Sequence, residues 1–103
     1  MTWVAACASD QVKDRSITRR RVNGQAIALT RLGADLAAFS NTCPHFEGPL
    51  GAGALVDDEV VCPWHFFRFN VRTGEAACVE KSIMKLQTFP IKEEGGTIFV
   101  QMG

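Results

Sequence analysis

The chain has 103 residues, and its eleven basic and eleven acidic side chains give a formal net charge of zero. A neutral chain has no overall field to attract nucleic acid or an anionic membrane, so we expect neither as a partner. Hydrophobic residues make up 47% and charged residues 21% of the chain, which is typical of a folded globular protein. The length fits a single domain, which we expect to span residues 1–103.

The beginning of the chain shows no targeting signal. Val4-Ala5-Ala6-Cys7-Ala8 lies too near Met1 to follow a leader, and no basic segment or apolar stretch precedes it. No apolar run reaches the roughly 18 residues that cross a bilayer. Four cysteines are compatible with disulfides in a secreted protein, but Cys43 and Cys62 each stand beside a histidine. We therefore expect a reducing, cytoplasmic location.

Short runs rich in Val, Ile, Thr and Phe, separated by turn residues, predict β-strands along most of the chain. The predicted strands are Thr2–Ala6, Ser16–Val22, Gln25–Leu32, Leu36–Phe39, Glu59–Val61, Phe67–Val71, Phe89–Lys92 and Thr97–Gln101, with one helical turn at Ser9–Asp14. Hairpin turns are predicted at Asn23-Gly24, Gly33-Ala34-Asp35 and Gly95-Gly96. The sequence thus predicts an all-β fold, an antiparallel sandwich or partly open barrel.

The stretch from about Asn41 to Gly74 differs from the rest because it is rich in Gly, Pro and aromatic residues. It contains Cys43-Pro44-His45 and, sixteen residues later, Cys62-Pro63-Trp64-His65. The chain has only two histidines, and both lie in these pairs. Cys43, His45, Cys62 and His65 therefore form a complete four-ligand set for a metal centre, carried on two loops at one end of the fold.

Zinc is the first alternative, since two Cys and two His make a common tetrahedral set. Its usual spacing pairs Cys with Cys and His with His, whereas each loop here supplies one Cys and one His. The mixture suits a two-iron cluster that has thiolates on one iron and imidazoles on the other. With its Cys-x-His and Cys-x-x-His pairs, Asn41-Thr42 before the first pair, and Arg72-Thr73-Gly74 after the second, the chain resembles Rieske proteins over nearly its whole length.

The resemblance implies a Rieske fold and one [2Fe-2S] cluster, with Cys43 and Cys62 on one iron and His45 and His65 on the other. The part from about 41 to 74 would be a cluster-binding subdomain inserted in a β base domain. Such a centre is coordinatively full, so it moves an electron and does not activate a substrate. The implied protein is therefore an electron carrier and not an enzyme.

By the same resemblance, the chain is a monomeric Rieske ferredoxin. It would pass electrons from a flavin-containing ferredoxin reductase to a terminal oxygenase that hydroxylates aromatic rings. Two alternatives stay open at this point. The chain could be the small Rieske subunit of an assimilatory nitrite reductase, or, from another class, a zinc-bound interaction module.

Four positions near the ligands bear on the reduction potential. High-potential members of the family carry an extra cysteine in each loop, where this chain has Gly48 and Trp64. They also carry a serine and a tyrosine whose hydroxyl groups donate to the cluster, where this chain has Phe67 and Phe69. We therefore predict a potential near the low end of the Rieske range, about −150 mV.

Two further cysteines and a run of three arginines are expected to have structural and not functional roles. Cys7 and Cys78 stand outside any Cys-x-x-Cys pair and are predicted to be small buried side chains. Arg19-Arg20-Arg21 falls on a predicted strand, where successive side chains point to opposite faces. We interpret the three arginines as a solvated sheet surface and not as a nucleic-acid site.

Overall fold

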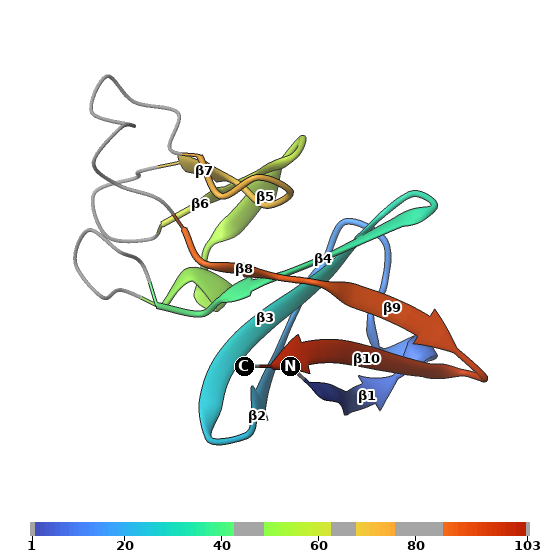
Figure 1. The fold of residues 1–103 in the computed structure, drawn as a ribbon. Coiled ribbons are helices and arrows are strands. Elements are labelled where there is room, and N and C mark those ends of the chain that lie inside the picture. Colours follow the sequence, from blue (N-terminus) through green and yellow to red (C-terminus); the bar gives the residue numbers. More distant parts are fainter. Residues whose placement is uncertain (1, 43–48, 63–67, 76–85, 103) are drawn as a thin grey trace.

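The structure, a computed structural model, describes residues 2–42, 49–62, 68–75 and 86–102 (Figure 1). The described strands are β1 (Thr2–Ala8), β2 (Ile17–Val22), β3 (Gln25–Leu32), β4 (Asp35–Ser40), β5 (Ala54–Val56), β6 (Glu59–Val61), β7 (Arg68–Asn70), β8 (Thr88–Phe89), β9 (Ile91–Glu94) and β10 (Thr97–Met102). The only helical elements in these ranges are two 3-10 turns, η1 (Ser9–Gln11) and η2 (Leu50–Ala52). No described helix is long and apolar enough to cross a membrane. The predicted all-β fold is confirmed.

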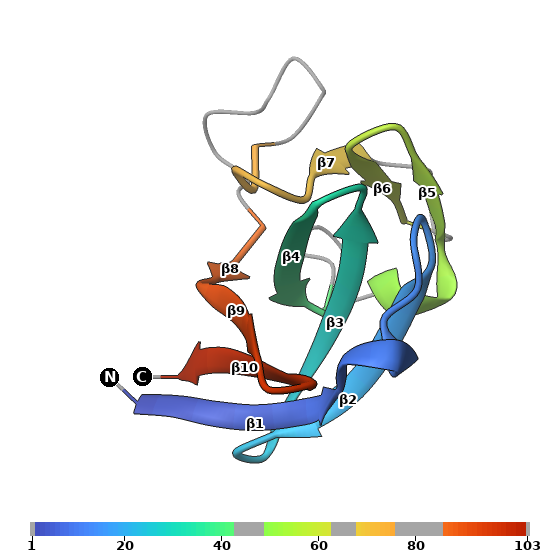
Figure 2. The same cartoon turned by 90° about the vertical axis from the view of Figure 1, so that its right-hand side faces the viewer.

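The strands form three antiparallel sheets that lie in layers (Figures 1 and 2). The four-stranded sheet β2-β3-β4-β8 is the middle layer. The sheet β1-β10-β9 covers one of its faces, and the sheet β5-β6-β7 covers the other. We call these the lower, middle and upper sheets, as they stand in Figure 1.

The middle sheet separates two cores, because alternate side chains of a strand point to opposite faces. The core between the middle and upper sheets contains Ala28, Leu32, Ala37, Phe39, Val60, Cys62, Phe69, Val71 and Leu86. The core between the middle and lower sheets contains Val12, Val22, Ile27, Leu29, Ala38, Ile98, Val100 and Met102. The first of these, which we call the upper core, holds one of the predicted ligands, Cys62.

The hairpin turns confirm the local predictions. Asn23 and Gly24 have φ values of 51° and 79°, so both central residues of the turn have the positive φ that a type I′ turn requires. Gly95 and Gly96 do the same at the turn between β9 and β10. Gln25–Leu32 and Glu59–Val61 form strands with the predicted bounds.

One prediction about the chain path was wrong, and another gave an element that is too long. Phe89–Lys92 is not one strand: Thr88–Phe89 pairs with β4, whereas Ile91–Glu94 pairs with β10. Pro90 separates the two strands, because it has no N–H to donate to the β4 ladder. Its carbonyl accepts from Gln101 N of β10 at 2.9 Å, so the chain turns to the lower sheet at this residue. The predicted helical turn is also shorter, since only Ser9–Gln11 is helical.

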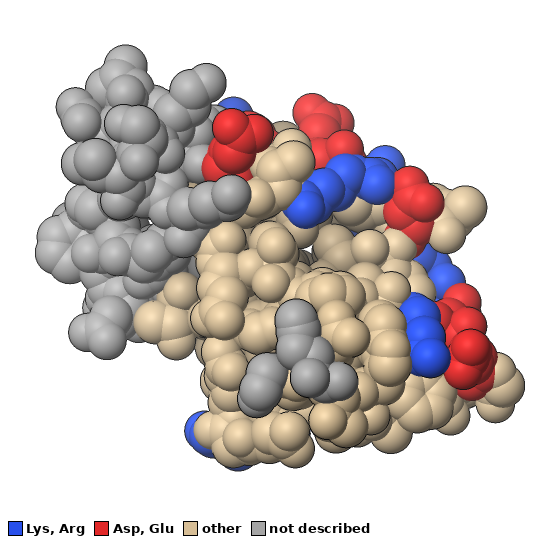
Figure 3. All heavy atoms as spheres, in the orientation of Figure 1, with Lys and Arg blue, Asp and Glu red and all other residues tan. Residues whose placement is uncertain are grey.

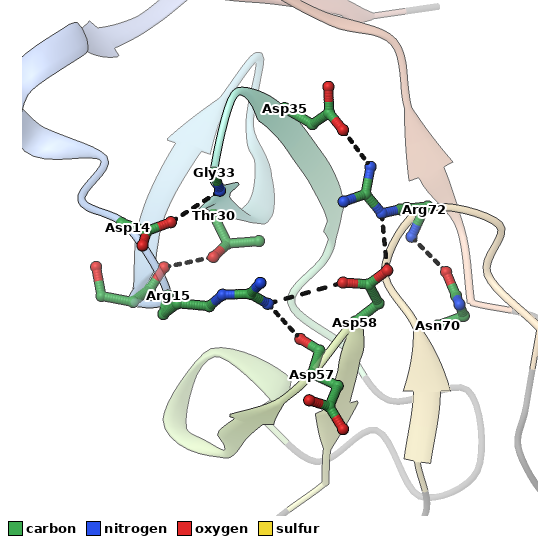
Figure 4. A network of polar contacts seen from close by, with 10 residues as sticks. Asp14, Arg15, Thr30, Gly33, Asp35, Asp57, Asp58, Asn70 and Arg72 are labelled. Carbon is green, nitrogen blue, oxygen red and sulfur yellow. Dashed lines mark hydrogen bonds and ion pairs between the residues drawn. The ribbon is translucent and has the colours of Figure 1, made fainter.

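Polar contacts tie the layers together at their edges. Between the middle and lower sheets, Arg31 Nη2 lies 3.0 Å from Glu93 Oε2, and Arg31 Nε donates to Val12 O at 2.9 Å. Between the middle and upper sheets, Arg72 Nη1 lies 2.8 Å from Asp35 Oδ2, and Arg72 Nε lies 3.0 Å from Asp58 Oδ2 (Figure 4). Each sheet is therefore joined to the next by an arginine that binds more than one acceptor.

Candidate metal centre

Of the four predicted ligands, Cys62 lies in the described part of the chain. Cys43, His45 and His65 lie outside the described residues, as do Gly48, Trp64, Phe67 and Cys78. The described part of the site consists of Cys62 and the segments that lead into and out of the ligand loops, 43–48 and 63–67.

Cys62 directly follows β6, and its side chain is 1% exposed. It belongs to the upper core, together with Val60, Phe69 and Leu86. A thiolate in such apolar surroundings is unfavourable unless a metal or another positive group compensates its charge. The chemistry of this position therefore fits a cysteine that coordinates a metal.

The first ligand loop leaves the middle sheet from a closed stem. An antiparallel bridge pairs Thr42 with Pro49, which brings together the two ends of segment 43–48. Before the bridge, Ser40 N donates to Gln87 O at 2.8 Å and Asn41 N donates to Ala26 O at 3.1 Å. The chain that leads into Cys43 is thus held by strands of the middle sheet.

Gly51 holds the other side of this stem. Its N–H donates to Asn41 Oδ1 at 2.7 Å. A Cβ built on Gly51 would meet that same oxygen and the Cγ and Cδ atoms of Arg19 at impossibly short distances. A glycine is therefore needed here so that the returning chain can lie directly against Asn41 and Arg19.

The second ligand loop is the connection between β6 and β7. Val61 pairs with Arg68 and Val60 pairs with Phe69, so the two strands come together at the point where segment 62–67 begins and ends. Outside this ladder, Arg68 Nε lies 3.5 Å from Glu59 Oε1. Cys62 is therefore the first residue beyond a paired strand end, and its position is set by the upper sheet.

The residues on either side of a third segment, 76–85, are also held together. Leu86 N donates to Gly74 O at 2.7 Å, which brings together the two ends of the chain around segment 76–85. Asn70 Oδ1 accepts from the N–H groups of Arg72 and Thr73 at 2.8 and 3.1 Å and thereby shapes the turn before Gly74. In Figure 1, the end of β4, the end of β6 and the start of β8 lie toward the same side of the fold.

Arg72 is the centre of a polar network that joins the upper sheet to the middle sheet (Figure 4). The hydrogen bond to Asp35, and to a smaller extent that to Asp58, raises the pKa of Arg72 above its usual value. Arg15 approaches the same turn, with Nη1 3.0 Å from Asp57 O and 3.7 Å from Asp58 Oδ1. The sequence indicated Arg72 only as part of a family motif, because a contact between residues far apart leaves no local pattern.

Cys7 lies in β1 as predicted, but it is half-buried and not fully buried. Burial raises the pKa of its thiol, Arg20 lowers it, and Asp10 raises it further. A raised pKa leaves less of the reactive thiolate at neutral pH. Among the described residues, no group of three or more His, Cys, Asp or Glu side chains is placed to hold a metal ion, so the structure offers no competing centre there.

The sequence-family model described as the Rieske [2Fe-2S] domain matches residues 2–90. The chain belongs to the Rieske [2Fe-2S] domain family. Its cofactor is therefore a Rieske-type [2Fe-2S] cluster, and the alternative of a zinc module is not supported.

Among similar proteins is the ferredoxin component of the p-cumate 2,3-dioxygenase system of Pseudomonas putida. It is 38% identical over 97% of this chain and 86% of that protein. The ferredoxin of carbazole 1,9a-dioxygenase from Nocardioides aromaticivorans IC177 is 30% identical, with a TM-score of 0.89 over all of both chains. A complex of reduced oxygenase and oxidized ferredoxin in carbazole 1,9a-dioxygenase contains a chain that is 31% identical, with a TM-score of 0.84 over 95% of this chain and 91% of that one. The predicted role as an electron carrier and not an enzyme is confirmed.

Proposed function

We propose that this chain is the ferredoxin component of a dioxygenase system. It accepts one electron from a flavin-containing reductase and delivers it to a terminal oxygenase that hydroxylates aromatic rings. The observation that carries the proposal is the 38% identity, over 97% of this chain, to the ferredoxin component of the p-cumate 2,3-dioxygenase system. These relatives favour the oxygenase role over that of a nitrite reductase subunit.

In the proposed site, Cys43 and Cys62 bind one iron of the cluster, and His45 and His65 bind the other. Three features support this assignment. Cys62 is buried at the end of a paired strand, the ends of the first loop are held by the Thr42–Pro49 bridge, and the chain has no histidines other than these two.

The ligand set also explains the type of chemistry. Two ferric ions, two sulfides and two thiolates sum to zero charge, so an added electron enters a neutral centre and not an anionic one. The neutral charge explains why Rieske clusters have higher reduction potentials than the all-cysteine clusters of plant-type ferredoxins, which have potentials of about −400 mV. Phe69 supplies no hydroxyl group to the upper core, where it lies fully buried together with Cys62. We therefore place the potential of this protein near the low end of the Rieske range, about −150 mV.

The remaining parts of the proposal concern the whole molecule. Residues 1–103 form one Rieske domain, with the cluster-binding part at about 41–74. The protein works as a monomer in the cytoplasm, where a reducing environment keeps cysteine thiols available as ligands.

The test is reconstitution of electron delivery. The purified holoprotein is reduced and mixed separately with the terminal oxygenases of the p-cumate, naphthalene and biphenyl dioxygenase systems, and transfer is followed by stopped-flow absorbance. We expect oxidation of the protein with at least one oxygenase, together with formation of hydroxylated product when reductase and NADH are added. Failure with all three oxygenases, by a protein that small redox dyes oxidise normally, would contradict the proposed function.

A further inference from the structure

The arginines of the described residues fall into two groups. Arg15, Arg31, Arg68 and Arg72 each lie within 4.0 Å of a carboxylate oxygen. On the face seen in Figure 3, acidic and basic side chains accordingly stand next to one another along its upper right margin. Arg19, Arg20 and Arg21 form no ion pair with any described residue, and we call these three the arginine patch. Within the part of the chain that the structure describes, the patch is a local excess of positive charge, whereas the whole chain has a net charge of zero.

Two of the three arginines are free to meet a partner. Arg19 and Arg21 are exposed and lie on the same face of β2, whereas Arg20 is half-buried. Arg21 Nη1 donates to Gly24 O at 2.7 Å, which holds the side chain against the β2-β3 turn and leaves its other donors available. The three arginines, with Ala26, Ile27 and Asn41, line a shallow hollow of about 280 Å³.

The patch is continuous with the stem of the first ligand loop. Arg21 pairs with Ala26 across the β2-β3 ladder, and Ala26 O accepts from Asn41 N. The aliphatic part of the Arg19 side chain lies against Gly51, whose N–H donates to Asn41 Oδ1. β2 thus runs beside η2 (Figure 2). Asn41 is two residues before the proposed ligand Cys43, so the patch adjoins the end of the molecule where the cluster is proposed to be held.

We infer that the arginine patch is the surface on which the terminal oxygenase docks, through carboxylates that the oxygenase presents next to its electron-accepting centre. This inference rests on the proposed function. Redox partners meet through small, short-lived interfaces, where complementary charge governs the rate and orientation of encounter. Arginine suits this role because its planar guanidinium group binds a carboxylate through two hydrogen bonds.

The oxygenase is chosen over other partners for two reasons. A solved complex in carbazole 1,9a-dioxygenase joins a chain similar to this one with its oxygenase. A nucleic acid would need a longer basic surface, whereas only two of the three arginines in the patch are exposed. In each encounter one electron leaves the reduced ferredoxin and one enters the oxygenase, and the patch changes only how often productive encounters occur.

The test compares two charge reversals, Arg21→Glu and Lys13→Glu. Lys13 is also an exposed cation without a described ion pair, and its Nζ donates only to a backbone carbonyl, that of Asp10. Lys13→Glu is therefore a matched control that changes the net charge equally, at a residue that precedes the start of β2, whereas Arg21 lies near its end. Arg21→Lys keeps the charge and serves as the conservative variant.

The rate measured is oxidation of the reduced protein by the oxygenase that accepts its electrons, at low and at high salt. We expect Arg21→Glu to slow this reaction about 3- to 10-fold at low ionic strength. The loss should disappear near 1 M salt, where the Debye length falls to about 3 Å. Lys13→Glu and Arg21→Lys should stay within about twofold of the unmodified protein. Unchanged circular dichroism and midpoint potential would show that the variants retain fold and cluster.

A second measurement uses small oxidants in place of the oxygenase. Arg21→Glu should slow oxidation by ferricyanide, an anion, and accelerate oxidation by hexaammineruthenium(III), a cation, and both effects should exceed those of Lys13→Glu. Equal effects in the two variants would overturn the inference, because the patch would then not lie beside the exit of the electron.

The remaining outcomes separate the inference from the proposed function. If the unmodified protein reduces an oxygenase and Arg21→Glu reduces it equally fast at low salt, the inference alone is wrong. If Arg21→Glu instead slows only reduction by the flavin reductase, the patch belongs to the reductase and the inference is overturned. If the unmodified protein reduces ferricyanide but no oxygenase, the proposed function fails and the inference falls with it.

Discussion

Arg72 binds Asp58 through Nε at 3.0 Å, and the same guanidinium group reaches Asp35 at 2.8 Å. Asp58 belongs to the β5-β6 turn of the upper sheet, whereas Asp35 begins β4 in the middle sheet. The backbone beside Arg72 is also bound to the β5-β6 turn, because Val71 N donates to Asp58 O at 2.9 Å. One side chain therefore connects the sheet that carries Cys62 to the sheet from which the first ligand loop emerges.

Asp58→Asn should weaken this connection without dismantling the fold. The ion pairs are at the surface, where each contributes little, and Asp35 still binds Arg72. We expect the Tm of the holoprotein to fall by about 2–5 °C in low salt and by less in 1 M salt. The control is Asp57→Asn, because only the backbone carbonyl of Asp57 contacts Arg15. Equal losses in both variants, measured by thermal unfolding, would show that the Asp58 carboxylate does not link the sheets.

Glu93→Gln should change how stability depends on pH. The hydrogen bonds from Arg31 lower the pKa of Glu93 below its usual value, so folding favours the charged carboxylate. A lowered pKa adds stability that is complete above the unfolded pKa, about 4.3, and is lost as pH falls through the lower folded value.

The unmodified protein should therefore be more stable than Glu93→Gln at pH 7, and the difference should shrink as the pH falls below about 4. Thermal unfolding of both proteins from pH 7 to 3.5 measures this difference. The control repeats this comparison in proteins that also carry Arg72→Gln, because Arg72 does not contact Glu93. The stability difference should depend on pH in the same way there. A difference that grows in acid would contradict the assignment of a lowered pKa to Glu93.

Gly51→Ala should loosen the stem of the first ligand loop. The new methyl group would meet Arg19 and Asn41 Oδ1, so the chain must shift and weaken the hydrogen bond from Gly51 N. Such overpacking typically costs about 1–3 kcal/mol, measurable by denaturant unfolding. Release of the cluster, followed by the loss of visible absorption, should also accelerate. The neighbouring Ala52→Ser, at an exposed position, should leave both quantities unchanged.

Phe69→Tyr should raise the reduction potential. Phe69 is fully buried in the upper core with Cys62. It stands at the position where the resemblance to high-potential family members implies a tyrosine whose hydroxyl group donates to the cluster. One added hydrogen bond of about 1 kcal/mol that favours the reduced state corresponds to about 40 mV for a one-electron couple. A redox titration followed by visible absorption measures the shift. An unchanged or lower midpoint would show that a hydroxyl group at this position does not reach the cluster.

Much of the fold could be predicted from local pattern. Gln25–Leu32 is a strand of the predicted length because apolar residues fill it and turn residues bound it. Asn23-Gly24 predicts its turn because both residues tolerate positive φ. The candidate ligands followed from the spacing of Cys and His, which is short and specific enough to need no tertiary information.

Other features depend on contacts between distant parts of the chain and were missed. The break at Pro90 divides one predicted strand between two sheets, because β8 pairs with β4 while β9 pairs with β10. The strand Ala54–Val56 was not predicted, because it lies within a stretch rich in Gly and Pro that the sequence indicated as loop. Gly51 is required by the side chain of Arg19, which is remote in the sequence. The arginine patch was correctly placed on a sheet surface, but its lack of ion partners among described residues emerged only from the structure.

In the proposed site, two thiolates and two imidazoles hold one [2Fe-2S] cluster. Because the chain has only His45 and His65, histidine labelled with ¹⁵N marks these two residues and no others. Pulsed electron paramagnetic resonance of the reduced, labelled protein should show two strongly coupled ¹⁵N nuclei, one from each histidine. A reduced protein with one or no coupled ¹⁵N, or without a paramagnetic signal, would contradict this ligand set.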